Sequence, residues 1–293
     1  MFRAAFRLAR PAALLAIAAV AVACVGSAGA AVPTPSPKPV DPDKVIFRVS
    51  WEGGFVTPDM LLGRLPVVAV YADGRVITQG PVLAIYPGPF MPNLQERTLS
   101  KAGLERLIEL ARDKDLLKDV HYDFPGIADA TDTVLEINLD GESHRVSAYA
   151  LTEAGLEGEI APAIEIPPAD VEGRAALREF IDALMTIPET DYVDQPHAYE
   201  FEALRLYVKP AEIVENSEFP GEQPPIAWPL DNLATAGTAI DNPSVDSCIV
   251  LGGDDLETVL PLLQGANQLS VFESEGVLYS LIPQPLYPGE SGC

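Results

Sequence analysis

The chain has 293 residues, with 43 Asp and Glu against 19 Lys and Arg, which gives a formal net charge of −24. A surface this acidic repels polyphosphates and anionic lipid headgroups, and no basic stripe interrupts it, so we expect no nucleic-acid partner. The length is enough for two modest domains.

The first 24 residues have the pattern of a leader sequence. Residues 1–10 contain three arginines and no acid, and an uncharged apolar run follows up to Cys24. That run is too short to span a hydrocarbon core of about 30 Å as a helix, but it fits the centre of a signal peptide. We therefore predict a signal peptide over residues 1–23 and an exported protein.

Two processing sites compete after this leader. "AVAC" at 21–24 resembles a bacterial lipobox, in which Cys24 would be lipidated and become the new N-terminus. "AGA" at 28–30 fits ordinary cleavage after Ala30, which would release a secreted protein. We favour the lipobox because Cys24 directly ends the apolar run and a proline-rich tether over 24–43 follows. The expected location is then the cell surface, with membrane contact only through the lipid.

Residues 44–151 are predicted to form a first α+β domain. Two Asp-Gly pairs, Asp73-Gly74 and Asp140-Gly141, each separate two β-rich runs, the strongest short signal for a hairpin. Between them lies a helical pattern for which Ser100 is the expected N-cap. Apolar residues alternate with polar ones after Asp132, which predicts an antiparallel sheet covered on one face only. The expected elements are a strand at 45–51, a hairpin at 65–80, a helix at 98–117 and a second hairpin at 132–151.

The rest of the chain is predicted to hold a connecting segment, 152–198, and a second α+β domain, 199–293. We expect Asp254 to cap the helix of the second domain, and Pro261 to bend it or end it early. The predicted fold class is α+β, with antiparallel hairpins each packed by a helix in two small domains. The expected elements are a helix at 170–186, a strand at 199–210, a short buried strand at 247–253, a helix from 254 and a hairpin at 269–288.

Two stretches carry a resemblance to known proteins. The run from "CIVLGGDDLETVLPLLQGANQL" to "LYSLIPQPLYPGESGC", and the pattern Y-x-D-G-x-V at 71–76 with a hairpin at 129–137, resemble uncharacterised secreted or lipid-anchored proteins of high-GC Gram-positive bacteria. The shared motifs are turns, a helix cap and a pair of cysteines. The resemblance implies location and fold, and it implies no activity.

Motifs for catalysis and for cofactors are missing from the sequence. There is no G-x-S-x-G, S-x-x-K, H-E-x-x-H, C-x-x-C, phosphate loop or G-x-G-x-x-G. The densest polar group is His121, Asp123, Asp129 and Asp132, which suit a hard metal ion or acid–base chemistry if they converge. We favour instead a surface loop whose aspartates cap turns. We therefore name no catalytic residue, metal or cofactor.

The remaining cysteines and aromatic residues favour structural roles. Once the leader is processed, Cys248 and Cys293 are the only cysteines of the folded part, and an oxidising compartment favours a disulfide between them. Several proline-flanked aromatics could line a groove, although ordinary packing is the favoured interpretation; they are Tyr86, Phe90, Trp228, Tyr279 and Tyr287.

The sequence thus favours an exported, lipid-anchored and non-enzymatic protein of the cell envelope, with a binding or structural role. Its expected partner is a protein, a peptide or an envelope component of unknown identity. Two alternatives stay open. One is an extracellular hydrolase whose site lies near His121, Asp123, Asp129 and Asp132, and the other is an inhibitor-like module that blocks an extracellular enzyme.

Overall fold

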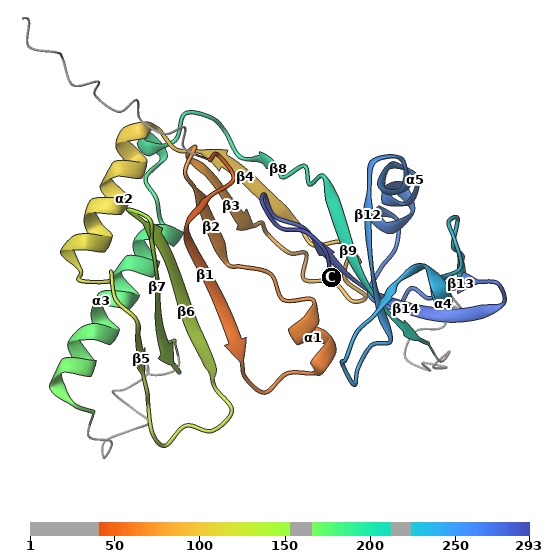
Figure 1. Ribbon diagram of the computed structural model, residues 1–293, viewed down its shortest axis with the longest axis horizontal. Helices are drawn as coiled ribbons and strands as arrows, with labels where there is room; N and C mark the ends of the chain where they lie inside the picture. Colours follow the sequence, from red (N-terminus) through yellow and green to blue (C-terminus); the bar gives the residue numbers. More distant parts are fainter. Residues whose placement is uncertain (1–40, 153–165, 212–223) are drawn as a thin grey trace, which may run out of the picture. The chain divides into compact units, whose positions relative to one another are not determined.

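The computed structural model describes residues 41–152, 166–211 and 224–293 (Figure 1). The chain divides into a unit of residues Met1–Pro39 and a unit of residues Val40–Cys293, and the described residues all belong to the second. The predicted signal peptide, Cys24 and most of the tether lie outside the described residues, so they stay predictions. Among the described residues no helix is both long enough and apolar enough to cross a bilayer.

The described part has helices and two sheets that are mostly antiparallel, which confirms the predicted α+β class. The larger sheet has eight strands in the order β5-β7-β6-β1-β2-β3-β4-β8, and only the β5–β7 pair is parallel. Its strands are β1 (Val45–Gly53), β2 (Val68–Tyr71), β3 (Arg75–Gln79), β4 (Leu94–Thr98), β5 (Val120–Tyr122), β6 (Thr131–Leu139), β7 (Glu142–Tyr149) and β8 (His197–Ala198).

The smaller sheet has six strands in the order β10-β13-β14-β9-β12-β11, and only the β10–β13 pair is parallel. Its centre is formed by the two long strands β9 and β14, which run antiparallel to one another. The strands are β9 (Ala203–Pro210), β10 (Ile226–Ala227), β11 (Thr238–Ala239), β12 (Ser247–Gly252), β13 (Phe272–Ser274) and β14 (Val277–Pro285).

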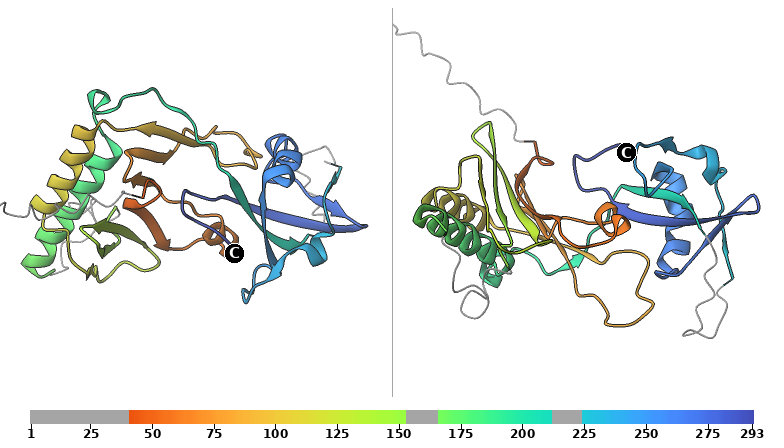
Figure 2. Two further views of the ribbon diagram at one scale, coloured as in Figure 1. Left: turned by 45° about the horizontal axis from the view of Figure 1, so that its top comes forward. Right: turned by 90° about the horizontal axis from the view of Figure 1, so that it is seen from below.

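Two helices cover one face of the larger sheet. Helices α2 (Lys101–Asp113) and α3 (Pro168–Met185) lie side by side on that face, as two views show (Figures 1 and 2). Their apolar stripes pack on alternate residues of the central strands, and Phe180 of α3 meets Phe47 of β1 edge to face at 5.1 Å. The helix of the predicted connecting segment therefore belongs to the core of the first sheet. The domain boundaries themselves stay a prediction.

The remaining helices are short or belong to the second sheet. Helix α1 (Pro58–Leu62) follows β1, the 3₁₀ helix η2 (Glu189–Asp191) precedes β8, and α4 (Leu233–Ala236) follows β10. Helix α5 (Gly253–Gln264) buries Leu256, Val259 and Leu263 against the second sheet.

The predicted hairpins and the first helix start are confirmed. Strands β2 and β3 flank Asp73-Gly74, and β6 and β7 flank Asp140-Gly141. Both Asp140 and Gly141 have positive φ angles, of 53° and 87°, as a tight two-residue hairpin turn requires. The Ser100 hydroxyl accepts a hydrogen bond from the Gly103 amide at 3.1 Å, which is the predicted N-cap.

The expected N-cap of α5 is wrong, and so is an early end of this helix at Pro261. The N-cap is Gly252, and no side chain bonds the free amides there, because Gly253 turns the chain with a φ of 53° and places Asp254 inside the first turn. Pro261 does not end the helix, which continues to Gln264. A proline near the C-terminal end removes only one amide donor, so the last turn tolerates it.

The hairpin of β6 and β7 buries alternate residues as predicted, but at β2 the larger sheet is covered on both faces, which was not expected. All four residues of β2 are buried. Val68 and Val70 join the core below α2 and α3, whereas Ala69 and Tyr71 join a separate cluster with Tyr199. That second cluster also contains Tyr287, so the chain that follows β14 returns to this face.

The predicted disulfide is present. Cys248 of β12 is bonded to Cys293, and their Cα atoms are 5.8 Å apart. The bond ties the last residue of the chain to the smaller sheet. We call residues 286–292, between β14 and this cysteine, the tail.

Candidate functional site

The predicted polar group around His121 comes together only in part. His121 of β5 places its Nδ1 atom 2.9 Å from the Ser147 Oγ atom and 3.6 Å from the Asp132 Oδ1 atom. Asp123 instead accepts a hydrogen bond from the amide of its neighbour Phe124. Asp129 adopts a φ of 58° in a turn. Among the described residues no three His, Cys, Asp or Glu side chains are placed to share a metal ion.

The geometry at His121 also differs from that of a nucleophile–base pair. In a Ser-His-Asp arrangement the serine and the carboxylate contact opposite ring nitrogens, so that one can receive a proton while the other orients the ring. Here Ser147 and Asp132 both lie on the Nδ1 side. The three side chains therefore form a local polar contact between neighbouring strands.

The proline-flanked aromatics do not form one groove. Trp228, Tyr279 and Tyr287 are buried, and Phe90 is half-buried. Tyr86 alone among the five is exposed. Packing, the favoured interpretation, accounts for the other four.

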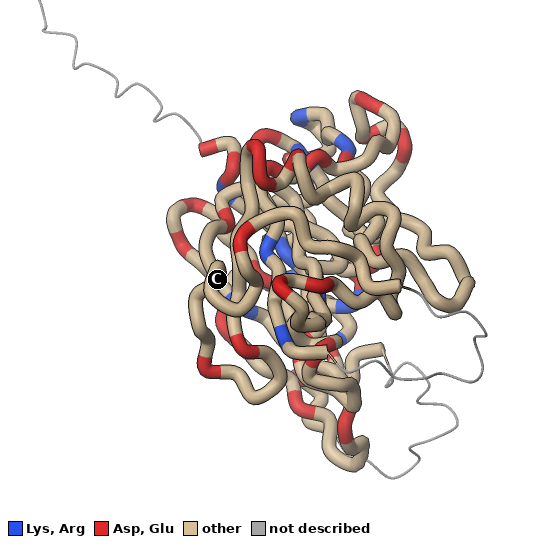
Figure 3. Tube along the Cα trace, turned by 90° about the vertical axis from the view of Figure 1, so that its right-hand side faces the viewer, with Lys and Arg blue, Asp and Glu red and all other residues tan. Residues whose placement is uncertain are grey.

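A cavity of about 570 Å³ lies on the face of the larger sheet opposite α2 and α3. We call it the arginine cavity, because Arg48, Arg64 and Arg205 all line it. Its walls come from β1, from α1 and the segment after it, from β6, from the ends of β9 and β14, and from the tail. Figure 3 shows a group of basic positions near the middle of the view, with acidic positions around it.

Strand alternation explains why polar side chains reach this face. Phe47 and Val49 of β1 point into the core below the helices, so Arg48, Ser50 and Glu52 point the other way. The register places Arg48 opposite Glu136 of β6, and Glu136 opposite Arg145 of β7. A charged row thus crosses three adjacent strands beside the cavity.

The acidic side chains of the cavity are already paired. Arg145 contacts Glu52 at 2.7 Å and Glu136 at 3.6 Å. Arg48 contacts Glu290 of the tail at 2.9 Å. Each of the three glutamates that line the cavity therefore has an arginine partner.

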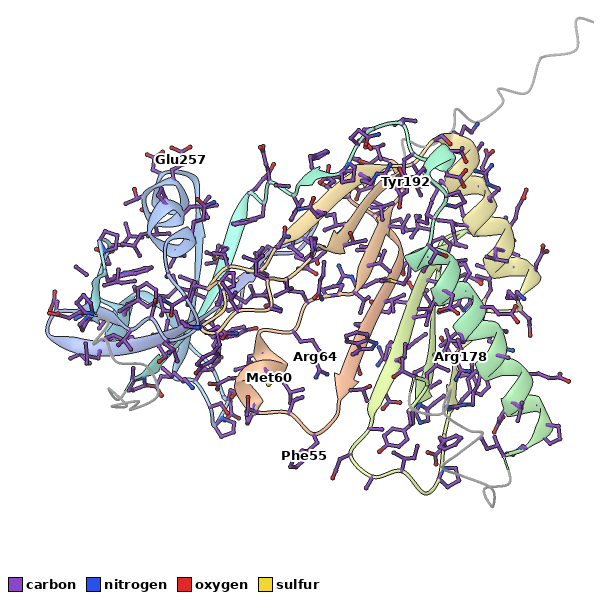
Figure 4. All side chains as sticks on the ribbon, turned by 180° about the vertical axis from the view of Figure 1, so that it is seen from behind. Phe55, Met60, Arg64, Arg178, Tyr192 and Glu257 are labelled. Carbon is purple, nitrogen blue, oxygen red and sulfur yellow. A yellow bond between two sulfur atoms is a disulfide. The ribbon has the colours of Figure 1, made fainter. Side chains whose placement is uncertain are left out.

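Arg64 and Arg205 line the same cavity, and neither forms an ion pair with any residue that the structure describes. Arg64 donates from Nη1 to the carbonyls of Trp51 at 3.1 Å and Gly53 at 2.9 Å. These carbonyls lie beyond Val49, where the pairing of β1 with β2 ends. Carbonyl dipoles orient a guanidinium, but they do not neutralise its charge. Figure 4 shows Arg64 between α1 and β1.

Arg205 is held by the end of the chain. Its Nε atom donates to the Gly292 carbonyl at 2.9 Å, and its Nη1 atom donates to the Gln284 Oε1 atom at 2.5 Å. The Gln284 amide nitrogen in turn lies 3.4 Å from the Arg64 carbonyl, which it reaches as a donor. Gln284 therefore links the two arginines, because it accepts a hydrogen bond from the Arg205 side chain and donates one to the backbone carbonyl of Arg64.

The tail is anchored at both ends, and this fixes one wall of the cavity. At its start the Tyr199 hydroxyl donates to the Leu286 carbonyl at 2.9 Å, and the Leu286 amide donates to Ala203. At its end the disulfide of Cys293 holds Gly292 beside Arg205. The terminal cysteine, predicted as a structural clamp, thus also positions a wall of the candidate site.

Two buried tyrosines, Tyr71 of β2 and Tyr287 of the tail, stay neutral near physiological pH. Burial raises the pKa of Tyr71 to about 12, although the positive charge of Arg48 opposes the shift. Burial likewise raises the pKa of Tyr287. The Tyr71 hydroxyl lies near the Arg48 guanidinium without the geometry of a well-formed hydrogen bond, and the Tyr287 hydroxyl has no hydrogen-bond partner among the described residues. These groups add no negative charge to the cavity.

A second cavity, of about 510 Å³, lies on the other side of the tail. Arg75 lines it, but this arginine is paired with Asp43 and Asp73, both at 2.6 Å. Burial raises the pKa of Glu96, which also lines this cavity. The unpaired positive charge therefore belongs to the arginine cavity.

Comparison with known proteins finds no protein family, no curated protein and no solved structure that matches this chain. The resemblance to uncharacterised exported proteins therefore stays a prediction.

Sequence reasoning missed this cavity. Strict alternation in "FRVSWE" could have placed Arg48, Ser50 and Glu52 on one face of β1. Nothing local marks Arg64 or Arg205, since they meet only through the packing of α1 and β9. An ion pair between Lys209 of β9 and Asp59 of α1 brings these two elements together.

Proposed function

We propose that the chain is an exported, lipid-anchored binding protein of the cell envelope, and that the arginine cavity holds an anionic group of its ligand. One observation supports the claim that the arginine cavity binds an anion. Arg64 and Arg205 line one cavity without an ion-pair partner among the described residues, in a chain whose net charge is −24.

An arginine that lines a cavity without an ion-pair partner is suited to bind an anion. The guanidinium stays protonated and presents five N–H donors in a planar fork that matches a carboxylate. Arg64 donates its hydrogen bonds to the protein from Nη1, and Arg205 from Nη1 and Nε, which leaves further donors on each group. Hydrogen bonds between charged partners in a partly enclosed site are about twice as strong as neutral ones.

Export rests on the leader sequence and on the disulfide. A basic start, a short apolar run and the small residues before Cys24 support processing at a lipobox. The Cys248–Cys293 bond fits an oxidising compartment. Intact-mass and peptide mass spectrometry of the mature protein tests this part. We expect a diacylglyceryl group on Cys24, and an unmodified N-terminus at Ala31 would contradict lipid anchoring while leaving export intact.

Anion binding is tested by NMR of the arginine side chains. We expect the Nε–Hε signals of Arg64 and Arg205 to shift in a saturable way when acetate is added, and not when the same concentration of chloride is added. The Arg64→Gln and Arg205→Gln variants should each weaken acetate binding about tenfold or more.

The matched control is Arg112→Gln, because Arg112 lies on α2 and is paired with Asp140, away from the cavity. This variant should bind acetate like the unaltered protein. Thermal unfolding of each variant verifies that it is folded. Shifts that do not saturate, or an equal loss in Arg112→Gln, would contradict an anion site at Arg64 and Arg205.

A further inference from the structure

Beyond a bare anion site, we infer that the ligand of the arginine cavity is a monocarboxylate with an apolar body, of which a medium-chain alkanoate is the simplest example. This inference rests on the proposed function, because it assigns the anion held by Arg64 and Arg205 to one end of a larger molecule. Three properties of the cavity carry it, namely its apolar rim, its charge and its size.

The rim of the cavity is apolar and exposed. Trp51 and Leu61 both line it and are 43% and 44% exposed, and Leu65 and Pro66 continue the same wall. Phe55 and Met60, on either side of the start of α1, do not line the cavity but are even more exposed. Figure 4 shows Phe55 extending away from the sheet and Met60 on α1. Large apolar side chains gathered at the mouth of a polar cavity are typical of a binding site.

The charge of the cavity favours a single negative charge. Its three glutamates are paired but still present, and the whole chain is strongly acidic. Both the attraction to the arginines and the repulsion from these acids double for a dianion such as phosphate, whereas the cost of removing the ligand from water grows roughly with the square of its charge, so a single charge is favoured. The contact between Glu290 and Arg48, at 2.9 Å, shows that a carboxylate fits an arginine of this cavity.

The same repulsion requires a second source of affinity. A small anion must overcome the field of an acidic protein, whereas an attached apolar chain gains free energy by leaving water. Each buried methylene contributes about 0.8 kcal/mol, or about a fourfold rise in affinity. The volume of about 570 Å³ lies within the range that small-molecule sites occupy, so there is room for such a chain.

The test compares ligands that separate charge from length. Isothermal calorimetry on the mature protein would measure acetate, butanoate and octanoate, with octanol and octylamine as probes that lack the carboxylate. We expect affinity to rise from acetate to octanoate by more than tenfold, and octanol and octylamine to bind at least tenfold more weakly than octanoate.

Trp51 offers an independent readout at the site. The chain has two tryptophans, and Trp228 is buried in the core of the smaller sheet. In a Trp228→Phe variant the fluorescence comes from Trp51 alone, so octanoate should change it with the affinity measured by calorimetry. Calorimetry on the unaltered protein stands by itself if this variant is unstable.

A pair of variants locates the apolar contact. Leu61→Ser should weaken octanoate severalfold more than it weakens acetate. The matched control is Val171→Ser, because Val171 is 50% exposed on α3, which covers the opposite face of the larger sheet. This control should bind both acids like the unaltered protein.

The possible results separate this inference from the proposed function. If acetate and octanoate bind equally, the anion site stands and the apolar body is refuted. If octanol binds as well as octanoate, the carboxylate is not recognised and both claims fail. If no acid binds, or if Leu61→Ser and Val171→Ser behave alike, the inference is overturned.

Discussion

Two side chains of the arginine cavity, Arg64 and Arg205, are held by neutral hydrogen-bond acceptors and keep their positive charge unpaired among the described residues. Arg64 is fixed by two backbone carbonyls and Arg205 by one carbonyl and one side-chain amide. These acceptors are neutral, so they hold both side chains in place without neutralising their positive charge. Arg48 and Arg145, by contrast, are matched to glutamates. The difference between these pairs of arginines is the basis of the proposed function.

Tyr71 provides a prediction at the same scale. Its hydroxyl is buried near the Arg48 guanidinium, without the geometry of a well-formed hydrogen bond. Replacing this hydroxyl by hydrogen avoids its desolvation and loses only a weak contact, so Tyr71→Phe should leave the free energy of unfolding at pH 7 unchanged or raise it by up to about 1 kcal/mol. Denaturant unfolding of both proteins measures this. A loss of stability would mean that the hydroxyl is bonded in the folded protein.

The pH dependence of the same variant has a definite sign. Burial raises the pKa of Tyr71 from 10.0 to about 12, so the folded protein keeps this proton at a pH where the unfolded chain has lost it. The resulting stabilisation is complete below pH 10 and is lost as the pH rises from there through about 12. Tyr71→Phe should therefore lose less stability than the unaltered protein over this interval. Parallel curves for the two proteins would contradict the raised pKa.

At the scale of elements, local sequence signals predicted most of the larger sheet. The hairpin turns at the two Asp-Gly pairs and the helix cap at Ser100 depend on neighbouring residues alone, and all three were predicted correctly. The cap of α5 was predicted wrongly because Gly253 can adopt a φ of 53°, which places the helix start two residues earlier than a cap at Asp254 would. The second covered face of β2 depends on the tail, which lies more than two hundred residues later in the sequence.

At this scale we predict that Gly173→Ala destabilises the protein, although helix propensity alone would predict that it stabilises it. In an exposed helix Gly→Ala adds about 1 kcal/mol of stability. In α3, however, a Cβ at Gly173 would overlap the ring and hydroxyl of the buried Tyr122 in β5. Gly173→Ala should therefore lower the free energy of unfolding by about 1–3 kcal/mol, as overpacked cores do.

Chemical denaturation measures this effect, and a second background provides its control. In a Tyr122→Ala protein the space beside Gly173 is open, so adding Gly173→Ala there should be neutral or stabilising. If Gly173→Ala stabilises the protein that retains Tyr122, then α3 does not pack against β5 as closely as described.

At the scale of the whole molecule, the candidate site is an outcome of long-range packing. Its arginines come from β1, from the segment after α1 and from β9, and its outer wall is the tail. Composition shows only that the chain is acidic, and it does not reveal that Arg64 and Arg205 lie in one cavity without an ion-pair partner among the described residues. The disulfide could be predicted because Cys248 and Cys293 are the only cysteines of the predicted folded part, whereas the cavity could be found only once the strands and the tail were placed.

Loss of the disulfide should affect both stability and binding. The bond between Cys248 and Cys293 closes a loop with a sequence separation of 45 residues, for which the chain-entropy relation gives roughly 4 kcal/mol. Cys293→Ser should therefore lower the melting temperature under oxidising conditions, and added reductant should lower that of the unaltered protein to a similar value. It should also weaken acetate binding, because Gly292 no longer holds Arg205. A melting temperature unaffected by both treatments would contradict the role of the clamp.

The most direct test of the central claim is a crystal structure of the mature protein with octanoate. We predict that the carboxylate lies within hydrogen-bond distance of the guanidinium groups of Arg64 and Arg205, and that the alkyl chain runs along Trp51 and Leu61. An arginine cavity without octanoate at saturating concentration, or octanoate bound with its carboxylate pointing away from both arginines, would contradict the account.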